Sequence, residues 1–292
     1  MRDGYVSVTG GRIWYGIVGA DKSGVPLVIL HGGPGAPHDY LEPLAALADE
    51  RPVIFYDQLG CGNSDKPDDA SLWVVERFVE ELGQLRTALT LTKVHLLGQS
   101  WGAALATEYM LVKQPEGVIS LVLSGPLLSA SRWIEDQKAY VRQLPEEAQE
   151  AIRNAEVSGN FQSTDYQNAM MIFYRRHLCR LDPWPDCLNR AFEKLSYPVY
   201  TQMWGPSEFT VTGTLKNFER LDALERITAP TLLTCGEFDE AAPSSVRHYQ
   251  RHLPGSEVVV IEGASHTHHL EKPDAFLKAV RDFLSRAEKR SR

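Results

Sequence analysis

Cysteine, positive charge and long hydrophobic runs are all scarce in this sequence. The 292 residues include four cysteines without CxxC spacing, so they indicate neither a disulfide framework nor a metal site. Buried thiols are the expectation; Cys179 and Cys187, which bracket a proline-rich loop, are the two that could pair. Lys and Arg total 30 against 38 Asp and Glu, a formal net charge of −8. This balance disfavours nucleic acid and anionic membranes as partners.

The sequence also lacks any run of about 18 apolar residues, the length needed to cross a membrane. Its first residues have no apolar segment of the kind found in secretion signals. We therefore expect a soluble, cytoplasmic protein.

The apolar segments that are present are short and nearly unbroken, which is typical of strands buried on both faces of a parallel sheet. Helical patterns separate several of them, most clearly at 75–89 and 276–284, and this alternation predicts an α/β fold. Near the N-terminus, period-two alternation around Gly10-Gly11 predicts an antiparallel hairpin. The predicted buried strands are 27–30, 53–56, 94–97, 121–123, 231–234 and 258–261.

The strand and helix alternation stops after Gly125-Pro126. Residues 127–219 contain no buried-strand run and are rich in aromatic side chains and polar helical patterns. We interpret this segment as a helical cap inserted into a core that is built from residues 1–126 and 220–292.

The segment Gly98-Gln99-Ser100-Trp101-Gly102 follows one predicted strand and opens a helical pattern. Glycines two residues either side of a serine allow the backbone to turn so sharply that the hydroxyl projects from the sheet edge. The pattern therefore predicts a nucleophile elbow with Ser100 as the nucleophile.

Such a serine needs an acid and a histidine later in the chain, in the order found in α/β-hydrolases. Asp239, just past the strand 231–234, is the preferred acid, and Glu237 in the same loop is the alternative. Asp57 precedes the serine and is expected to pin the glycine-rich loop around Gly60 and Gly62 instead.

His266, in the loop after the strand 258–261, is the predicted general base, because a neutral imidazole there can take the serine proton and pass it to the leaving group. His268 and His269 lie in the same loop and are expected to be loop or cap-facing residues. The first glycine loop, His31-Gly32-Gly33-Pro34-Gly35, follows the strand 27–30. We expect the amides of Gly33 and Trp101 to form the oxyanion hole, and His31 to be structural.

Six sequence blocks follow one another along the chain: His31-Gly-Gly-Pro-Gly35, Asp57-Gln-Leu-Gly-Cys-Gly-Asn-Ser64, Gly98-Gln-Ser-Trp-Gly102, Pro206-Ser-Glu-Phe-Thr-Val-Thr-Gly213, Gly236-Glu-Phe-Asp-Glu240 and Ser265-His266. In this order they resemble the proline iminopeptidase family, especially its tricorn-interacting aminopeptidase branch, and L-amino acid amidases are similar. The resemblance runs from about residue 25 to the C-terminus and is loose in the cap. One departure is Ala103, which replaces the family's second glycine after the elbow.

The resemblance implies a catalytic triad of Ser100, Asp239 and His266, in agreement with the assignment from chain order. It also implies that Glu208 and Glu240 bind the free amine of the substrate. Paired carboxylates suit this task, because an ammonium group in a closed pocket needs anionic partners to offset its lost hydration.

The expected activity is release of N-terminal proline or small apolar residues from small peptides or amino acid amides through an acyl-enzyme, without cofactor or metal. Trp204 and Tyr174 are expected to wall the pocket for the first side chain. A neutral histidine and a charged substrate amine predict an optimum at roughly pH 7 to 8. The alternatives are a broader esterase, amidase or carbon–carbon bond hydrolase that needs no amine, and a ligand-binding receptor with a vestigial triad.

Overall fold

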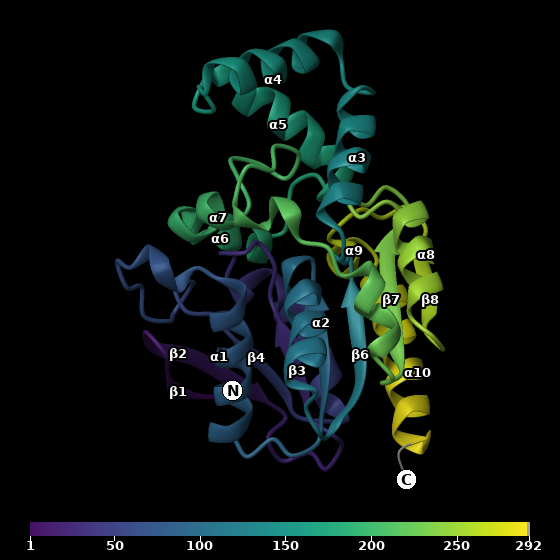
Figure 1. The fold of residues 1–292 in the computed structure, drawn as a ribbon. Coiled ribbons are helices and arrows are strands. Elements are labelled where there is room, and N and C mark those ends of the chain that lie inside the picture. The colour runs from purple at the N-terminus through teal and green to yellow at the C-terminus, as the bar shows by residue number, and fades with distance from the viewer. Residues whose placement is uncertain (291–292) are drawn as a thin grey trace.

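A computed structural model describes residues 1–290 of the chain. Within them, eight strands form one sheet in the order β1-β2-β4-β3-β5-β6-β7-β8 (Figure 1). The pairs β1–β2 and β2–β4 are antiparallel, and all later pairs are parallel. The strands are β1 (Arg2–Val8), β2 (Gly11–Val18), β3 (Leu27–Leu30), β4 (Val53–Tyr56), β5 (Val94–Gln99), β6 (Val118–Ser124), β7 (Thr231–Gly236) and β8 (Glu257–Ile261).

This sheet confirms the predicted α/β fold, its N-terminal hairpin and its mostly parallel order. Strands β3 and β4 coincide with the predicted ranges, whereas β5, β6, β7 and β8 are each longer by one to four residues. The unbroken apolar runs are explained by burial on both faces. Val28 and Leu30 of β3 pack into one hydrophobic cluster, and Leu27 and Ile29 pack into the other.

Helices cover both faces of the sheet. The helices α1 (Val75–Ala88), α2 (Trp101–Lys113) and α8 (Pro243–His252) contribute to one hydrophobic cluster. The 3-10 segment η1 (His38–Asp49) and the helix α10 (Pro273–Arg290) contribute to the other. The short helix α9 (His268–Glu271) precedes α10, and further 3-10 turns are η2 (Ala70–Leu72), η3 (Thr214–Asn217) and η4 (Leu221–Arg226).

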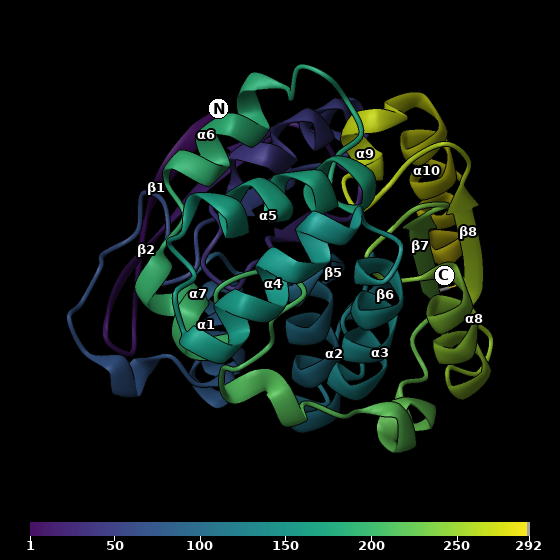
Figure 2. The ribbon, with the colours of Figure 1, turned by 90° about the horizontal axis from the view of Figure 1, so that it is seen from above.

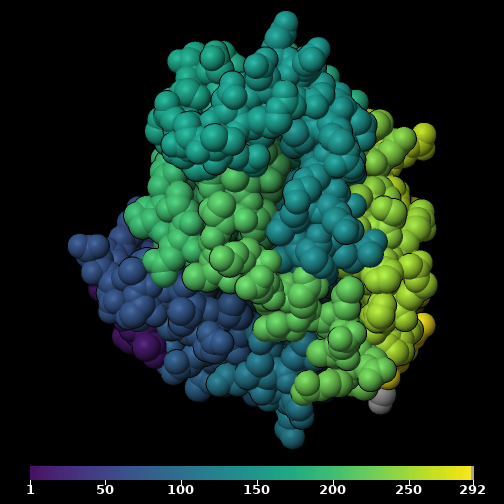
Figure 3. Space-filling model, turned by 45° about the horizontal axis from the view of Figure 1, so that its top comes forward, coloured from purple at the N-terminus to yellow at the C-terminus, as the bar shows by residue number. Residues whose placement is uncertain are grey.

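The segment between β6 and β7 is helical, and Figures 1 and 2 show α4 and α5 lying over the carboxyl ends of the strands. Side-chain oxygens of Ser129 and Ser163 accept backbone N–H bonds at the starts of α3 and α5. In Figure 3 these helices close over the top of the core. The domain boundaries drawn from the sequence stay a prediction. The helices of this segment are α3 (Ala130–Val141), α4 (Glu146–Ser158), α5 (Thr164–His177), α6 (Asp186–Glu193) and α7 (Tyr197–Met203).

All four cysteines are free thiols, so Cys179 and Cys187 do not pair. Within residues 1–290, no helix combines the length and the apolar character that a membrane crossing requires.

Candidate active site

Ser100 lies at the turn between β5 and α2, with φ 57° and ψ −119°. This backbone conformation is rare for a side chain with a Cβ atom and is held by close packing on both sides. A Cβ atom on Gly98 would lie 2.2 Å from the Gly102 carbonyl oxygen, and one on Gly102 would lie 2.1 Å from that of Leu30. Both glycines are therefore required for the turn, whereas Ala103 is simply buried in the core.

Asp239 follows β7 and is completely buried. Its Oδ1 accepts hydrogen bonds from His266 Nδ1 at 2.7 Å and from the Ala241 amide at 2.8 Å, and its Oδ2 accepts one from the Gly236 amide at 2.9 Å. Burial alone would raise the pKa of Asp239, but the charge and hydrogen bond of His266, together with His268, hold it well below its usual range. Asp239 is thus placed to stay ionised and to orient the His266 ring.

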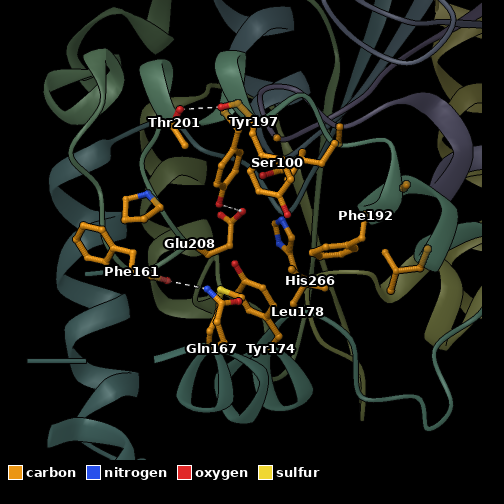
Figure 4. A pocket seen from close by; sticks show the side chains of 18 of the residues that line it. Ser100, Phe161, Gln167, Tyr174, Leu178, Phe192, Tyr197, Thr201, Glu208 and His266 are labelled. Carbon is orange, nitrogen blue, oxygen red and sulfur yellow. Dashed lines mark hydrogen bonds between the residues drawn. The ribbon is translucent and has the colours of Figure 1, made fainter. Parts of the chain in front are cut away.

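His266 lies in the loop after β8 and lines the same cavity as Ser100 (Figure 4). Its backbone amide donates to the His177 carbonyl at 2.9 Å, and its ring packs edge to face against Trp133 with centroids 5.7 Å apart. Burial lowers the pKa of His266, yet the Asp239 charge and hydrogen bond outweigh burial and leave the pKa raised. Because Nδ1 donates to Asp239, Nε2 is the ring atom that can receive a proton.

His268 is a second imidazole on the same aspartate. Its Nδ1 lies 3.3 Å from Asp239 Oδ2 and 3.1 Å from the Ser265 carbonyl oxygen. Both are acceptors, so Nδ1 carries the proton and Nε2 accepts from the hydroxyls of Ser124 and Thr234, each 2.9 Å away. The ring therefore ties Asp239 to the ends of β6 and β7.

The expectation that His268 and His269 are loop or cap-facing residues is wrong, because α9 begins at His268 and turns both rings into the core. His269 Nε2 donates to the Tyr40 carbonyl oxygen at 3.0 Å. Burial lowers the pKa of His269 to about 3, so this ring stays neutral. Three histidines within four residues are apparent in the sequence, but the short helix that begins two residues after His266 is not.

The other acids considered from the sequence have different partners. Glu237 is exposed and accepts from the Gly263 amide at 2.9 Å. Asp57 is buried and accepts from the His38 backbone and ring nitrogens and from the Asn63 amide, all at 2.8 Å. Asp57 thus pins the loop after β4, as its position suggested.

The first glycine loop is held against the elbow by a chain of hydrogen bonds. The Gly32 amide donates to Tyr40 Oη at 2.7 Å, and Tyr40 Oη donates to Gln99 Oε1 at 2.6 Å. Gly33, with φ 108°, lines the cavity beside Ser100. Trp101 is the first residue of α2, so its amide lies at a helix N-terminus, where backbone N–H groups lack helical partners.

His31 and Gln58 complete the support of this region. His31 Nε2 accepts from the Gln58 amide at 2.9 Å, and Gln58 Oε1 accepts from Trp101 Nε1 at the same distance. Burial lowers the pKa of His31 to about 4, which keeps the ring a neutral acceptor. His31 is a structural residue in this arrangement, as expected.

A cavity of about 650 Å³ lies between the strand ends and the cap. Tyr174 lines it, as expected from the sequence, but Trp204 does not. Trp204 is buried behind the wall and packs edge to face against Trp133 at 5.7 Å. Most of the lining comes from α5, α6, α7 and the 159–162 loop, and the side chains that these segments turn toward the cavity are apolar or neutral (Figure 4).

Two glutamates are the acidic side chains of this region besides Asp239. Glu208 lines the cavity and accepts from Tyr200 Oη at 2.8 Å, and burial raises its pKa. Glu240 is fully buried, and neither of its carboxylate oxygens has a hydrogen-bond partner among the described residues. Its Oε2 lies 3.8 Å from His266 Nε2. The pKa of Glu240 is raised well above its usual range, chiefly by burial and to a lesser extent by the negative charges of Glu208 and Asp239.

An unpartnered buried carboxylate is costly, and the raised pKa of Glu240 reflects this cost, because burial favours the neutral form of the carboxyl group. Tyr200 was missed from the sequence, because nothing in its local pattern reveals that the cap brings it to Glu208. Within residues 1–290, no cluster of His, Cys, Asp and Glu is placed to hold a metal ion.

Comparison with known proteins agrees with this geometry. A family model described as the alpha/beta hydrolase fold matches residues 25–273. The proline iminopeptidase of Heyndrickxia coagulans is 44% identical over 97% of this chain and 98% of its own. That of Saccharolobus solfataricus is 36% identical over 97% of this chain and 92% of its own.

Two solved structures are similar throughout. The proline iminopeptidase of Mycobacterium smegmatis has a TM-score of 0.92 at 37% identity and covers both chains fully. VinJ has a TM-score of 0.94 at 35% identity over 98% of this chain and 99% of its own. The fold and the site define this protein as an α/β-hydrolase of the serine type. Within that class, the chain belongs to the proline iminopeptidase family.

Proposed function

We propose that this enzyme releases an N-terminal amino acid, proline or a small apolar residue, from peptides or amino acid amides. The observation that carries the proposal is the Glu240 carboxylate. It is buried and unpartnered, and it lies within 4 Å of the histidine that shares a cavity with Ser100. The names of the family members are consistent with a substrate that presents a free amine.

In the proposed reaction, His266 Nε2 takes the Ser100 proton as the serine oxygen attacks the carbonyl carbon of the first residue. The amides of Gly33 and Trp101 receive the negative charge that develops on the carbonyl oxygen; one such donor is typically worth about 3 to 4 kcal/mol. The proton on His266 then passes to the leaving amine as the amide bond breaks. A water molecule, deprotonated by His266, then attacks the acyl-enzyme, and the amino acid is released as the proton returns to Ser100. Asp239 stabilises the imidazolium in each half of the reaction.

Glu208 and Glu240 are the proposed binding partners of the substrate ammonium group. A cation between them would favour the ionised forms of two carboxyl groups whose pKa values are raised by burial and, at Glu240, by the charge of Glu208. Because Oε2 of Glu240 also lies near His266, the bound ammonium would belong to the same residue as the carbonyl that Ser100 attacks. This spacing favours removal of a single residue from the amino end.

The test compares proline, alanine and phenylalanine arylamides, each with and without N-acetylation. The proposal expects acetylation to abolish turnover and proline or alanine to be preferred. Equal turnover of acetylated and free compounds would instead indicate an esterase or amidase that needs no amine. A fluorophosphonate that fails to label Ser100 would indicate a binding protein.

A further inference from the structure

The acid loop (residues 237–240), which contains the proposed catalytic acid, is held from two sides. On the side of the sheet its backbone amides donate. The Glu237 amide donates to the Ile261 carbonyl oxygen at 3.0 Å, and the Phe238 amide donates to that of Ala264 at 2.9 Å. On the opposite side, three consecutive backbone carbonyls of the loop accept hydrogen bonds from side chains of the cap. The cap is therefore part of the support of this loop.

Two of the three donors come from α3. Gln137 Nε2 donates to the Glu240 carbonyl oxygen at 2.8 Å, and Tyr140 Oη donates to that of Asp239 at 3.1 Å. Residues three apart on a helix share a face. Because α3 follows β6, the neighbour of β7 in the sheet, and stands above the end of β6 in Figure 1, this face meets the acid loop. Burial and nearby carboxylates raise the pKa of Tyr140, so its hydroxyl keeps the proton that it donates.

The third donor is His177, the last residue of α5. Its Nδ1 donates to the Phe238 carbonyl oxygen at 2.9 Å, and its ring stacks on Tyr140 with centroids 4.0 Å apart. Burial lowers the pKa of His177, so the ring is neutral at pH 7 and carries its proton on Nδ1. The backbone carbonyl of His177 also accepts from the His266 amide at 2.9 Å. The end of α5 thus contacts the acid loop and the histidine loop together.

We propose that Gln137, Tyr140 and His177 are positioning residues through which the cap holds the acid loop against the proposed general base. Among the described residues that line the cavity, none of the three is found, so they act on the reaction only through the loop that they hold. Helix α5 lines the cavity with Met170 and Tyr174, so the helix that walls the substrate pocket also aligns the triad. The inference rests on the proposed triad and goes beyond it.

The first test removes one donor atom. Tyr140→Phe deletes the hydroxyl that the Asp239 carbonyl accepts from and keeps the ring that stacks on His177. Burial lowers the pKa of His266, and Asp239 makes the largest contribution in the opposite direction, which a looser acid loop weakens. We expect the apparent pKa of His266, read from the pH dependence of fluorophosphonate labelling, to fall by about 0.5. For proline p-nitroanilide, kcat should fall about fivefold, the effect of one typical hydrogen bond, with KM nearly unchanged.

Tyr109→Phe is the matched control. It removes the hydroxyl of a buried tyrosine of α2, which accepts from Arg86 Nη1 at 3.0 Å and joins α2 to α1. It therefore loses a comparable hydrogen bond without touching the acid loop, and it should change neither the pKa nor kcat. An unchanged pH profile in Tyr140→Phe, or an equal change in both variants, would overturn the inference. A wild-type protein that fluorophosphonate does not label would instead refute the proposed triad.

A second pair of variants tests the donor on α5. His177→Leu removes Nδ1 and should lower the apparent pKa of His266 as Tyr140→Phe does. His177→Asn carries an amide in the place of Nδ1 and lacks the ring in the same way, so it should bring the pKa and kcat back toward the wild-type values. An Asn variant as impaired as the Leu variant would indicate a role in packing alone and would contradict the inference.

Discussion

Replacing Glu240 by glutamine removes one of the two proposed ammonium partners while keeping the shape of the side chain. Loss of one partner from a buried ion pair typically costs about 3 to 5 kcal/mol. Because Glu208 remains, we take the lower end, about 3 kcal/mol, which corresponds to a loss of roughly a hundredfold in kcat/KM. The expected loss applies to substrates with a free amine.

The same substitution should stabilise the ligand-free protein. Burial and neighbouring charges raise the folded-state pKa of Glu240 above the ordinary 4.5, so the folded chain holds this proton more tightly than the unfolded chain does. Wild-type stability therefore falls as pH rises from 4.5 toward the folded-state pKa. The Glu240→Gln variant has no titratable group at this position and does not lose stability in this way. Its Tm should therefore equal that of the wild type below pH 4.5 and exceed it increasingly above that pH.

The assay measures kcat/KM for proline p-nitroanilide and for p-nitrophenyl acetate, together with Tm between pH 4 and 8. Glu237→Gln is the matched control, because this exposed carboxylate lies in the same loop and contacts the Gly263 amide instead of the site. Wild-type turnover of proline p-nitroanilide by Glu240→Gln would refute the reasoning. So would an equal loss on the acetate, which carries no amine.

Three further results are expected. Ser100→Ala should lower kcat/KM by a factor on the order of 10⁵ and abolish fluorophosphonate labelling, and substantial residual turnover would exclude Ser100 as the nucleophile. The pKa of His266 is raised above 6.5, and the base must be neutral, so kcat/KM should rise with pH through an apparent pKa above 6.5. It should fall again as the substrate amine loses its proton near pH ~8. A pH-rate profile still climbing beyond pH 9 would contradict an ammonium contact. His268→Gln removes the Nδ1 donor to Asp239 and leaves that carboxylate less stabilised, so it should raise the apparent pKa of His266 and lower kcat several-fold. His268→Asn, whose amide can replace Nδ1 as the donor, should restore both values. His269→Gln is the control in the same pH-rate measurement, because His269 has no bond to Asp239.

Much of the fold could be predicted because its signals are local. Strands β3 and β4 were located to the residue, since a strand buried on both faces leaves an unbroken apolar run with sharp ends. The elbow at Ser100 could be predicted equally well, because the glycines that it needs are marked in the sequence. A Cβ atom at Gly98 would clash with Gly102, a few residues along the chain, and one at Gly102 would clash with the neighbouring strand β3.

The cap was less predictable because its packing depends on long-range contacts. Trp204 and Tyr174 had the same aromatic signal, yet Tyr174 faces the cavity and Trp204 packs behind it against Trp133. Likewise, the hydrogen bond from Tyr200 to Glu208 depends on how α7 meets the following loop, which no periodicity records.

The sequence by itself determined the α/β class, the hairpin, the elbow and the order of its serine, acid and histidine, because these follow from residue types at short spacing. Tertiary structure alone decided which titratable groups meet. It placed His268 on Asp239, turned His269 toward Tyr40, and left Glu240 buried without a hydrogen-bond partner near His266. Such contacts join loops that are far apart in the chain, and their energies depend on burial, which only the packed fold creates.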